Sequence, residues 1–504
     1  MQTIPFISWD FIHSGACAWS DDERRVPCDV PHGIELQVEP ARISQPILEA
    51  DRPWEANNVS WVQVMQDNDL YRMWYGVSAR HEGKSEYLCY AESDDGLDWR
   101  KPELGIVEVD GSAANNIVWE ARGASHCCVF RDPSAPEDAR YRCLTLSVWC
   151  EGDNGEEIHE DEALRRLNVN NTAARGTPPL PVELKMHMVG LNSPDGLHWT
   201  KIEKPILDEW HDSHNICRYD EAKGKYVGYF RAFYQGRRAV GYAETEDFEN
   251  WPPTRVIHHQ IISDKPGDSV YSFAYTKYPG SPHIHLMFPA MYDLSDDGIE
   301  GHLAVSTDGV NWSRHTGTAA IPRGKPGEPH EAFVYPGPDL LCFHDETRFR
   351  VPVRAGCRYH NRGYNKTFDK GEAGTFFAWA EWTEHRLAGI HAAEEGAFTV
   401  GMQCGDRLLA NFRTEPDGWV RFELVDRVTW PPVQADSLEG YRFEDTEPIN
   451  GDETHACVSW RDQNALPDMK GVFVRVRLCK ATLFSLTMYG VDDPGVRDDP
   501  RYPV

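Results

Sequence analysis

The feature that most limits the fold of this chain is a seven-residue phrase, Ser-x-Asp-Gly-x-x-Trp, which occurs three times. The copies end at Trp99, Trp199 and Trp312, and a degenerate copy, Thr-Glu-Asp-Phe-Glu-Asn-Trp, ends at Trp251. Asp-Gly favours a tight turn, because glycine adopts positive φ at little cost. A turn that recurs at intervals of roughly 50 to 60 residues, with one longer interval, indicates an architecture of repeated units.

Short runs typical of β-strands precede each copy. SWVQVM, LYRMWYGV and EYLCYAES stand before Trp99, similar groups of runs precede the other copies, and EAFVYPG, RFRVPVRAG and GTFFAWAEW follow the last one. The runs are aromatic and β-branched and are bounded by turn residues. Five units of four antiparallel strands, each with the phrase as a turn before its last strand, predict an all-β chain with a five-bladed β-propeller.

Two domains are expected, a propeller over residues 1–385 and a second domain over 386–504. The blades are predicted at about 55–105, 126–205, 212–260, 268–320 and 330–385. The N-terminal stretch 1–50 is expected to pack on the outside of the propeller and to help close its ring, and 150–183 is expected to form an acidic insertion in the second blade. Short alternating runs in the last part of the chain predict a C-terminal β-sandwich.

The chain is strongly acidic, with a formal net charge of −29 over 504 residues. This charge repels nucleic acid and anionic membranes and suits a neutral or cationic small ligand better. The N-terminus lacks a basic region and an apolar core, and no apolar run approaches the roughly 18 residues of a membrane span, so neither a signal peptide nor a membrane segment is expected. The 13 cysteines are scattered, which is typical of reduced thiols and predicts a cytoplasmic protein.

Acidic and polar residues stand near the head of the first strand in each predicted blade. Because the innermost strands of a propeller start at one rim, these residues are expected to face one another around a central pocket. Like charges repel, so acids at every blade entrance favour a functional reason for their placement. The candidates are Asp51, Trp54, Glu55, Arg131, Asp132, Asp212, His214, Asn215, Asp268, Tyr271, His330 and Glu331.

Two stretches carry a resemblance to known enzymes. VFRDPSAPEDARYRCL contains the run Arg131-Asp132-Pro133. The C-terminal segment starts with Gly-x-x-x-x-Glu-Leu in GWVRFELVD and finishes with Leu-Phe-Ser in KATLFSL. On these motifs the chain resembles glycoside hydrolase family 32 over nearly its whole length, and its predicted propeller is also similar to family 43. The sequence lacks the Trp-Met-Asn-Asp-Pro-Asn-Gly motif of family 32 and so resembles a divergent relative.

The resemblance implies roles for three carboxyl groups, because glycoside hydrolysis needs a proton donor and a nucleophile or base. Asp132 would stabilise the transition state, Glu55 would be the nucleophile or base, and Asp212 would be the acid. Asp51 is the reserve for Glu55, and Glu331 competes with Asp212 for the role of acid.

The remaining candidates are expected to bind the substrate. Trp54 and Tyr271 are suited to stacking on the flat face of a sugar. Polar contacts are expected from Arg131, His214, Asn215, Asp268, His330 and Glu331. A neighbouring His-Glu pair has no metal-ligand spacing, so neither a metal nor a cofactor is expected, and the oligomeric state is left open.

The sequence therefore predicts an exo-acting glycoside hydrolase that removes a terminal sugar from small oligosaccharides or glycosides. The resemblance implies a furanoside such as a fructofuranoside or arabinofuranoside, and retention or inversion depends on the separation of the carboxyl groups. One alternative is a glycoside phosphorylase or glycosyl transferase, with Arg131, Arg231 and Arg354 as phosphate ligands. Another is a non-catalytic carbohydrate-binding propeller. The repeated phrase is also similar to the sialidase Asp-box, but the sequence shows no evident trio of arginines for a sugar carboxylate.

Overall fold

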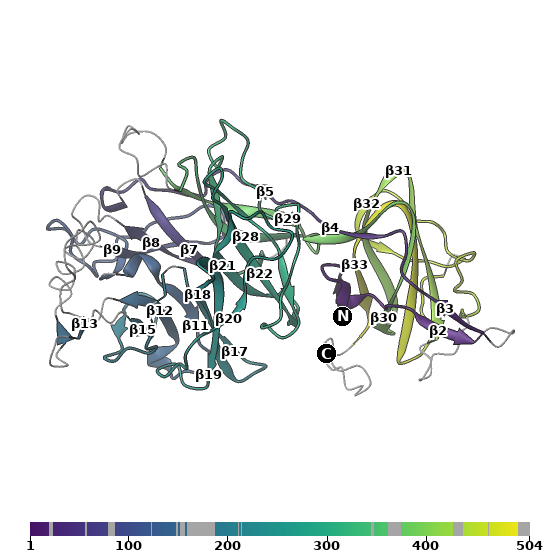
Figure 1. Ribbon diagram of the computed structural model, residues 1–504, viewed down its shortest axis with the longest axis horizontal. Helices are drawn as coiled ribbons and strands as arrows, with labels where there is room; N and C mark the ends of the chain where they lie inside the picture. The colour runs from purple at the N-terminus through teal and green to yellow at the C-terminus, as the bar shows by residue number, and fades with distance from the viewer. Residues whose placement is uncertain are drawn as a thin grey trace.

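The computed structural model shows an all-β chain, in which the helical elements among the described residues are single 3-10 turns such as η2 (Pro53–Glu55). Figure 1 shows two bodies, one built from strands between residues 42 and 383 and the other from strands after residue 387 joined by N-terminal strands. The described residues are 1–491 except 20–23, 56–57, 79–85, 122, 148–149, 152–156, 159–186, 210, 213, 344–346, 361–373, 427–436 and 462.

Three separate four-stranded antiparallel sheets come first and are named sets one to three. Set one contains β7 (Val59–Asp67), β8 (Leu70–Ser78), β9 (Glu86–Ser93) and β10 (Ile117–Glu120). Set two contains β11 (Cys128–Arg131), β12 (Tyr141–Ser147), β15 (His187–Ser193) and β16 (Thr200–Lys201). Set three contains β17 (Ile216–Asp220), β18 (Lys225–Tyr234), β19 (Arg237–Thr245) and β20 (Arg255–His258).

Two further sets share one larger sheet. Set four contains β21 (Asp268–Tyr278), β22 (Ser281–Asp293), β24 (Ala304–Ser306) and β25 (Ser313–Arg314). Set five contains β26 (Phe333–Pro336), β27 (Leu341–Cys342), β28 (Arg348–Gly356) and β29 (Phe376–Thr383), with β5 (Arg42–Ile43) and β6 (Leu48–Glu49) on its edge. The two sets are joined where β23 (Gly298–Gly301) pairs in parallel with β26.

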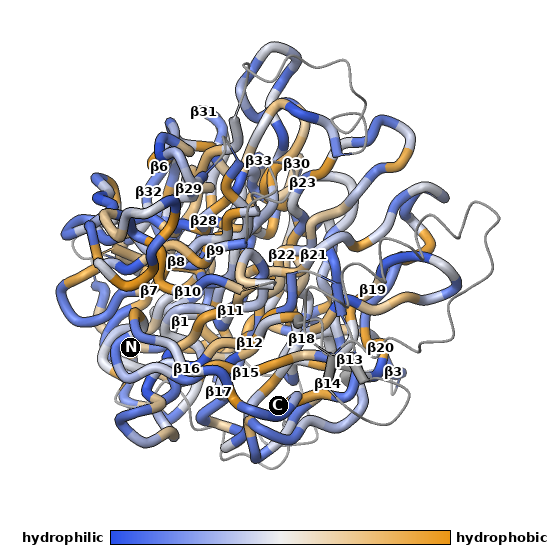
Figure 2. The backbone as a smooth tube through the Cα atoms, turned by 90° about the vertical axis from the view of Figure 1, so that its left-hand side faces the viewer, coloured by the Kyte–Doolittle hydropathy of each residue, from blue (hydrophilic) through white to orange (hydrophobic). Residues whose placement is uncertain are grey.

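The middle strands of the sets are buried on both faces, which explains their nearly continuous apolar sequences. In β8, Tyr75 packs in a cluster shared with set five, while its neighbour Trp74 packs in a cluster shared with set two. In β18, Tyr229 faces set four and Phe230 faces set two. Figure 2 shows this pattern as hydrophobic strands inside hydrophilic peripheral loops. Each set is therefore packed between two others, and set one adjoins set five.

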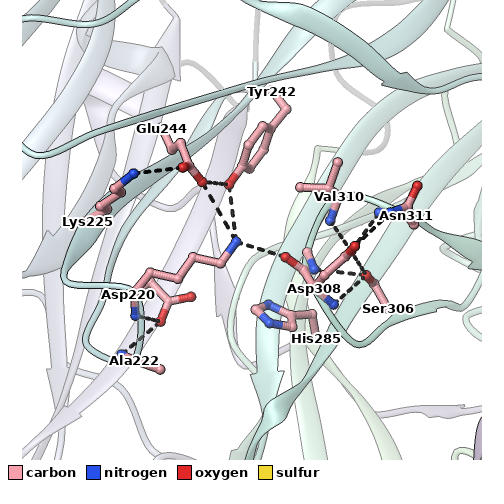
Figure 3. A network of polar contacts seen from close by, with 12 residues as sticks. Asp220, Ala222, Lys225, Tyr242, Glu244, His285, Ser306, Asp308, Val310 and Asn311 are labelled. Atoms are coloured by element: carbon pink, nitrogen blue, oxygen red, sulfur yellow. Dashed lines mark hydrogen bonds and ion pairs between the residues drawn. The ribbon is translucent and has the colours of Figure 1, made fainter. Parts of the chain in front are cut away.

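The repeated phrase forms the same turn in all three copies. In the third copy the Ser306 hydroxyl accepts the Gly309 N–H at 2.9 Å, and the Asp308 carboxylate accepts the next two N–H groups at 2.8 and 2.7 Å. The glycines adopt φ of +75°, +77° and +74°, as the Asp-Gly pair predicts. Figure 3 shows the third turn beside Tyr242 and Glu244 of set three.

Each of these turns contacts the preceding set. The glycine carbonyls accept side-chain donors, Gly96 from Trp379 Nε1 at 3.0 Å, Gly196 from Trp74 Nε1 at 2.8 Å, and Gly309 from the Tyr229 hydroxyl at 2.9 Å. In the degenerate copy, Phe248 packs instead on Phe130 of set two. In set five, His385 follows β29 and its ring nitrogen lies 2.7 Å from the hydroxyl of Tyr278 in set four. The turns thus link the five sets in cyclic order, because the turn of set one contacts set five.

The second body is one six-stranded sheet. Its long strands are β30 (Ala388–Gln403), β31 (Arg407–Asp426) and β33 (Gly471–Tyr489), with β32 (Asp452–Cys457) on one edge. The sequence predicts that all of 1–50 packs on the first domain, but β1 (Gln2–Pro5) pairs with β33 and β4 (Glu35–Val38) pairs with β30. The N-terminal stretch therefore contributes short strands that pair with strands of both bodies. One apolar core continues from set four through set five into this sheet.

The expected insertion 150–183 lies largely outside the described residues. Its described part is a small hairpin of β13 (Cys150–Glu151) and β14 (Glu157–Ile158). Among the residues that the structure describes, no helix is long and apolar enough to span a membrane.

Candidate functional site

Glu55, the expected nucleophile, lies in a closed polar network beside β8. Its side chain has no exposed surface, and Lys101 Nζ donates to both carboxylate oxygens at 2.8 Å. The Tyr75 hydroxyl donates to Oε1 at 2.6 Å, and the Arg52 N–H donates to Oε2 at 2.9 Å. A carboxylate enclosed by these donors offers no face to a sugar in this structure, so its contacts favour a structural role.

Asp51 and Trp54 belong to the same network. Asp51 accepts from Lys101 Nζ at 2.6 Å, and Trp54 Nε1 donates to Asn116 Oδ1 at 3.0 Å. Asn116 Nδ2 in turn donates to the Tyr75 hydroxyl at 2.7 Å. Burial raises the pKa of Tyr75 well above its ordinary value, which keeps the phenol protonated as a donor. The residues before β7 therefore anchor this loop to β8.

Asp132, the expected transition-state stabiliser, closes the turn between β11 and β12. Its buried carboxylate accepts the N–H and hydroxyl of Ser134 at 2.9 and 2.7 Å. It also accepts Arg142 Nε at 2.6 Å and the Tyr226 hydroxyl at 2.7 Å. These contacts fix the last residue of β11 and the start of the turn, as Asp-Pro pairs often do. Arg131 is half exposed, and its guanidinium lies 3.8 Å from a carboxylate oxygen of Asp67.

Asp212, the expected acid, stands just before β17 with His214 and Asn215. Arg231 Nη1 donates to Asp212 Oδ2 at 2.8 Å, and the Arg231 side chain is 1 % exposed whereas that of Asp212 is 42 % exposed. Asn215 Oδ1 accepts the Arg231 N–H at 2.8 Å, and Asn215 Nδ2 donates to the His211 carbonyl at 3.0 Å. The structure thus presents Asp212 as a carboxylate held by a buried cation and open to solvent.

Aromatic side chains from sets one, three, four and five gather next to this ion pair. The central cluster consists of Trp61, His214, Tyr271, Tyr292, Tyr335 and His360. Trp61 stacks on His214 with 4.9 Å between ring centroids and 6° between ring planes. Tyr335 connects them to Tyr271, since its centroid lies 5.3 Å from Trp61 and 5.4 Å from Tyr271. The expected residues His214 and Tyr271 therefore lie in one aromatic group.

Three arginines lie on the central cluster. The Cζ atoms of Arg231 and Arg238 are 4.6 and 4.8 Å from the centroid of Tyr271. Arg354 Cζ is 5.5 Å from the centroid of Tyr335, and its Nη2 donates to Asn58 Oδ1 at 3.2 Å. These distances are within the range of cation–π attraction. Arg354 and Arg238 are half-buried, as is Tyr271, so this part of the cluster meets solvent.

The electrostatics of the cluster follow from burial and from these guanidinium groups. Burial lowers the pKa of His360, and the charges of Arg238, Arg354 and Arg231 lower it further against the opposing charge of Asp297. The ring of His360 is therefore neutral at neutral pH.

Deeper along the inner strands, polar contacts tie three sets together. Gln63 Nε2 donates to the Cys127 carbonyl at 2.5 Å and lies 3.3 Å from His214 Nε2, and the Val129 N–H donates to Gln63 Oε1. Burial lowers the pKa of His214 to about 3, so this histidine is neutral. Its ring stacks on that of Trp61. His214 is thus an internal support of the cluster.

Asp268, His330 and Glu331 make their described contacts within their own turns. Asp268 accepts the Lys265 N–H at 3.0 Å, and burial raises its pKa. Glu331 accepts the Gly327 N–H, and His330 Nε2 lies 3.8 Å from a carboxylate oxygen of Glu328. In the described parts of the chain, no group of three or more His, Cys, Asp or Glu side chains is arranged to hold a metal ion.

Several cluster residues were not predicted from the strand heads. Trp61 and Tyr335 lie inside the apolar runs SWVQVM and EAFVYPG, Arg238 begins the third run of its unit, and His360 follows β28. Bulky aromatic residues within the first strands were the available signal. The heads of those strands fold partly into local turns instead.

No family model matches the chain. "Uncharacterized protein MT1551" of Mycobacterium tuberculosis (strain CDC 1551 / Oshkosh) is 31% identical over 119 residues, which is 21% of this chain and 36% of that protein. The chain thus spans about a third of the length of that curated relative.

The solved structures to which the chain is similar include several that are named as glycoside hydrolases. A "Glycoside hydrolase" has a TM-score of 0.44 at 16% identity, covering 68% of this chain and 92% of its own. The exo-inulinase of Aspergillus awamori has a TM-score of 0.41 at 10% identity, covering 89% and 99%. The family 32 β-fructofuranosidase of Bombyx mori has a TM-score of 0.40 at 8% identity, covering 88% and 94%. One of these neighbours is named as a member of family 32, which the sequence resembles.

Proposed function

We propose that this protein is a glycoside hydrolase that cleaves a terminal sugar at the central cluster. The observation that carries the proposal is the position of Asp212, a half-exposed carboxylate held by buried Arg231 beside the half-buried ring of Tyr271. Aromatic faces stack on sugar rings, and a carboxyl group is the usual catalytic group of glycosidases. The two features occur together here.

We also propose that the five strand sets are the blades of a five-bladed β-propeller and that the C-terminal sheet folds over itself as a β-sandwich. The cyclic order of the interlocking turns supports the propeller. Register shifts in β30 and β31, after Ala392 and Thr414, support strands that bend across two layers. In a propeller the inner strands surround one axis, and a site at its mouth suits removal of a single terminal unit.

The role we propose for Asp212 differs from the acid that the resemblance implies. Arg231 Nη1 donates to Asp212 Oδ2 at 2.8 Å, and a carboxylate that accepts from a guanidinium group in this way is suited to act as nucleophile or base. The leaving group tests this role. A 2,4-dinitrophenolate departs without protonation, so Asp212→Asn should abolish cleavage of activated aryl glycosides if Asp212 is the nucleophile or base. Retention of that cleavage, with loss on unactivated substrates, would assign it as the acid.

The activity itself is tested with a panel of 2,4-dinitrophenyl and 4-nitrophenyl furanosides and pyranosides, with arabinofuranosides and fructofuranosides included. Release of the phenol together with a free reducing sugar, in the absence of phosphate, supports a hydrolase. If no member of the panel is cleaved but sugars bind, the chain is a carbohydrate-binding protein and the proposal is wrong.

A glycoside phosphorylase is the second candidate, and one observation favours it. Of the three arginines expected as phosphate ligands, Arg231 and Arg354 lie on the central cluster, whereas Arg131 is beside Asp67. A phosphorylase would release a sugar 1-phosphate, and its rate would rise with added inorganic phosphate. The same panel with and without phosphate distinguishes the two reactions.

A further inference from the structure

We propose that the substrate carries its own carboxylate, as a sugar acid does, and that Arg231, Arg238 and Arg354 bind this carboxylate at the central cluster. The inference rests on the proposed function only for the assumption that a sugar occupies this cluster. Its starting point is that the structure brings together three arginines that lie far apart in the sequence, on β18, β19 and β28.

The three guanidinium groups share the same aromatic neighbours. Arg231 and Arg238 both lie on Tyr271, and Arg354 lies on Tyr335, whose ring is 5.4 Å from that of Tyr271. Like charges brought this close repel one another, and the repulsion is offset when an anion binds among them. Guanidinium groups also bind carboxylates through paired N–H donors, which gives direction as well as charge.

The balance of charge around the cluster favours a monoanion. Among the described residues, Asp212 and Asp297 contact members of the site. Asp212 pairs with Arg231 at 2.8 Å, and Asp297, which accepts the Tyr292 hydroxyl at 2.8 Å, acts on His360. Since His360 is neutral, it adds no charge to these groups. A carboxylate carries a single negative charge and is therefore repelled less by the two aspartates than a phosphate dianion is. The net charge of −29 would favour a neutral or cationic ligand, but the local charge decides at short range.

The arginines differ in how they are held. Arg231 is buried and fixed by Asp212 and Asn215, so it is a preorganised part of the site. Arg238 is half-buried, and its buried Nε has no hydrogen-bond acceptor among the described residues. Such a donor is costly unless a ligand supplies the acceptor. Arg238 is therefore the residue whose replacement tests the inference with the least disturbance to the fold.

Calorimetric binding of sugars that differ only in the carboxylate tests the proposal directly. The pairs are D-glucuronate with D-glucose and D-galacturonate with D-galactose, and inorganic phosphate is titrated separately. We expect at least one sugar acid to bind about tenfold or more tightly than its neutral partner, because charge-assisted hydrogen bonds are strong. Arg238→Met should remove that advantage. The matched control is Arg237→Met, the adjacent exposed residue of β19, which should keep it.

Each outcome has a distinct meaning. Equal binding of acid and neutral sugars, or an advantage that survives Arg238→Met, overturns the inference. Binding of phosphate without binding of sugar acids also overturns it and favours the phosphorylase. Selective binding of a sugar acid without cleavage of any aryl uronide supports the carboxylate site but contradicts the hydrolase. Thermal unfolding of both variants checks that each is folded.

Discussion

At the scale of single residues, burial separates Glu55 and Asp132, which are enclosed by the fold, from Asp212, which is exposed to solvent. Glu55 and Asp132 are enclosed by donors, whereas 42 % of the Asp212 side chain is exposed. Carboxyl groups near the heads of the strands are thus either enclosed by the fold or exposed to solvent. The surroundings decide between them, because a carboxylate acts on a substrate only where the substrate can reach it.

The first prediction concerns Glu55. Glu55→Gln should lower the free energy of unfolding by about 3 kcal/mol, because it leaves the buried Lys101 with only the exposed carboxylate of Asp51 as a charge partner. The specific activity of the folded variant should change little. Thermal and urea unfolding measure the loss of stability. The rate at which the purified, folded variant cleaves the best aryl glycoside measures the activity.

A double variant controls this experiment. Glu55→Gln with Lys101→Met removes both charges and should regain part of the lost stability. A stable Glu55→Gln protein that has lost its activity would contradict the structural role and restore Glu55 as a catalytic candidate.

The sequence located part of the candidate site. Asp212, His214 and Tyr271 were expected from their place in the third and fourth units, and the structure brings them together. Glu55 and Asp132 were expected because they also flank first strands. Whether such a residue reaches the central cluster or fixes a local turn depends on hydrogen-bond donors that are distant in the sequence. Here these donors are Lys101 for Glu55 and Tyr226 for Asp132, and no local sequence pattern encodes them.

At the scale of elements, the repeated turn connects neighbouring sets through hydrogen bonds. The side-chain bonds of its serine and aspartate shape the turn, and its glycine carbonyl accepts a donor from the preceding set. This places the phrase on the scaffold, as the strand pattern predicts. Burial raises the pKa values of Asp308 and Asp195, but the backbone N–H groups that donate to these carboxylates outweigh burial and lower both pKa values to about 2.

The second prediction separates two contributions of the turn glycine to stability, its positive φ and its contact with set three. Gly309→Ala should destabilise the protein by about 1–3 kcal/mol, because the residue has a φ of +74° and a Cβ would lie 2.9 Å from the Tyr229 hydroxyl. Gly280→Ala, with a φ of +73° and open space around its Cβ, pays the backbone cost alone. Chemical unfolding of both variants measures the difference.

The expected result is a larger loss for Gly309→Ala than for Gly280→Ala. Equal losses of unfolding free energy would mean that contact with set three contributes nothing at this turn. The repeated phrase would then stabilise only its own turn and not the contact between sets.

The order of the strands was predictable where sequence signals are local. Turn residues and apolar runs delimit the five sets, and most strands lie inside the expected units. The pairing of β1 with β33 and of β4 with β30 was not predictable, because a short edge strand has no sequence mark for its partner. The long strands β30, β31 and β33 likewise read as several shorter runs, since bulges interrupt their alternation.

At the scale of the whole molecule, buried histidines make the fold sensitive to acid. Burial lowers the pKa of His214 to about 3 and the pKa values of His258, His285 and His385 to about 4. In the unfolded chain each would titrate at about 6.5. The unfolded state therefore binds more protons below pH 6.5, so the stability held at neutral pH is lost as pH falls from 6.5 toward 4.

The third prediction follows from this sign. The free energy of unfolding should fall between pH 7 and pH 5 by several kcal/mol, at up to about 1.4 kcal/mol per pH unit for each buried histidine. Urea unfolding across this range measures it, and most carboxyl groups stay ionised there. His385→Phe, which keeps the stacked ring against Tyr278, should flatten the dependence. A stability that is constant from pH 7 to pH 5 would show that these rings are protonated in the folded protein.

The central claim is that catalysis takes place at the central cluster through Asp212, and the specificity constants of three carboxamide variants test it most directly. On the best 2,4-dinitrophenyl glycoside of the panel, we predict that Asp212→Asn loses at least about 100-fold in kcat/KM. Glu55→Gln and Asp132→Asn, measured as folded protein, should stay within about threefold of the unaltered enzyme. Full activity of Asp212→Asn together with loss in either of the other two would contradict the account.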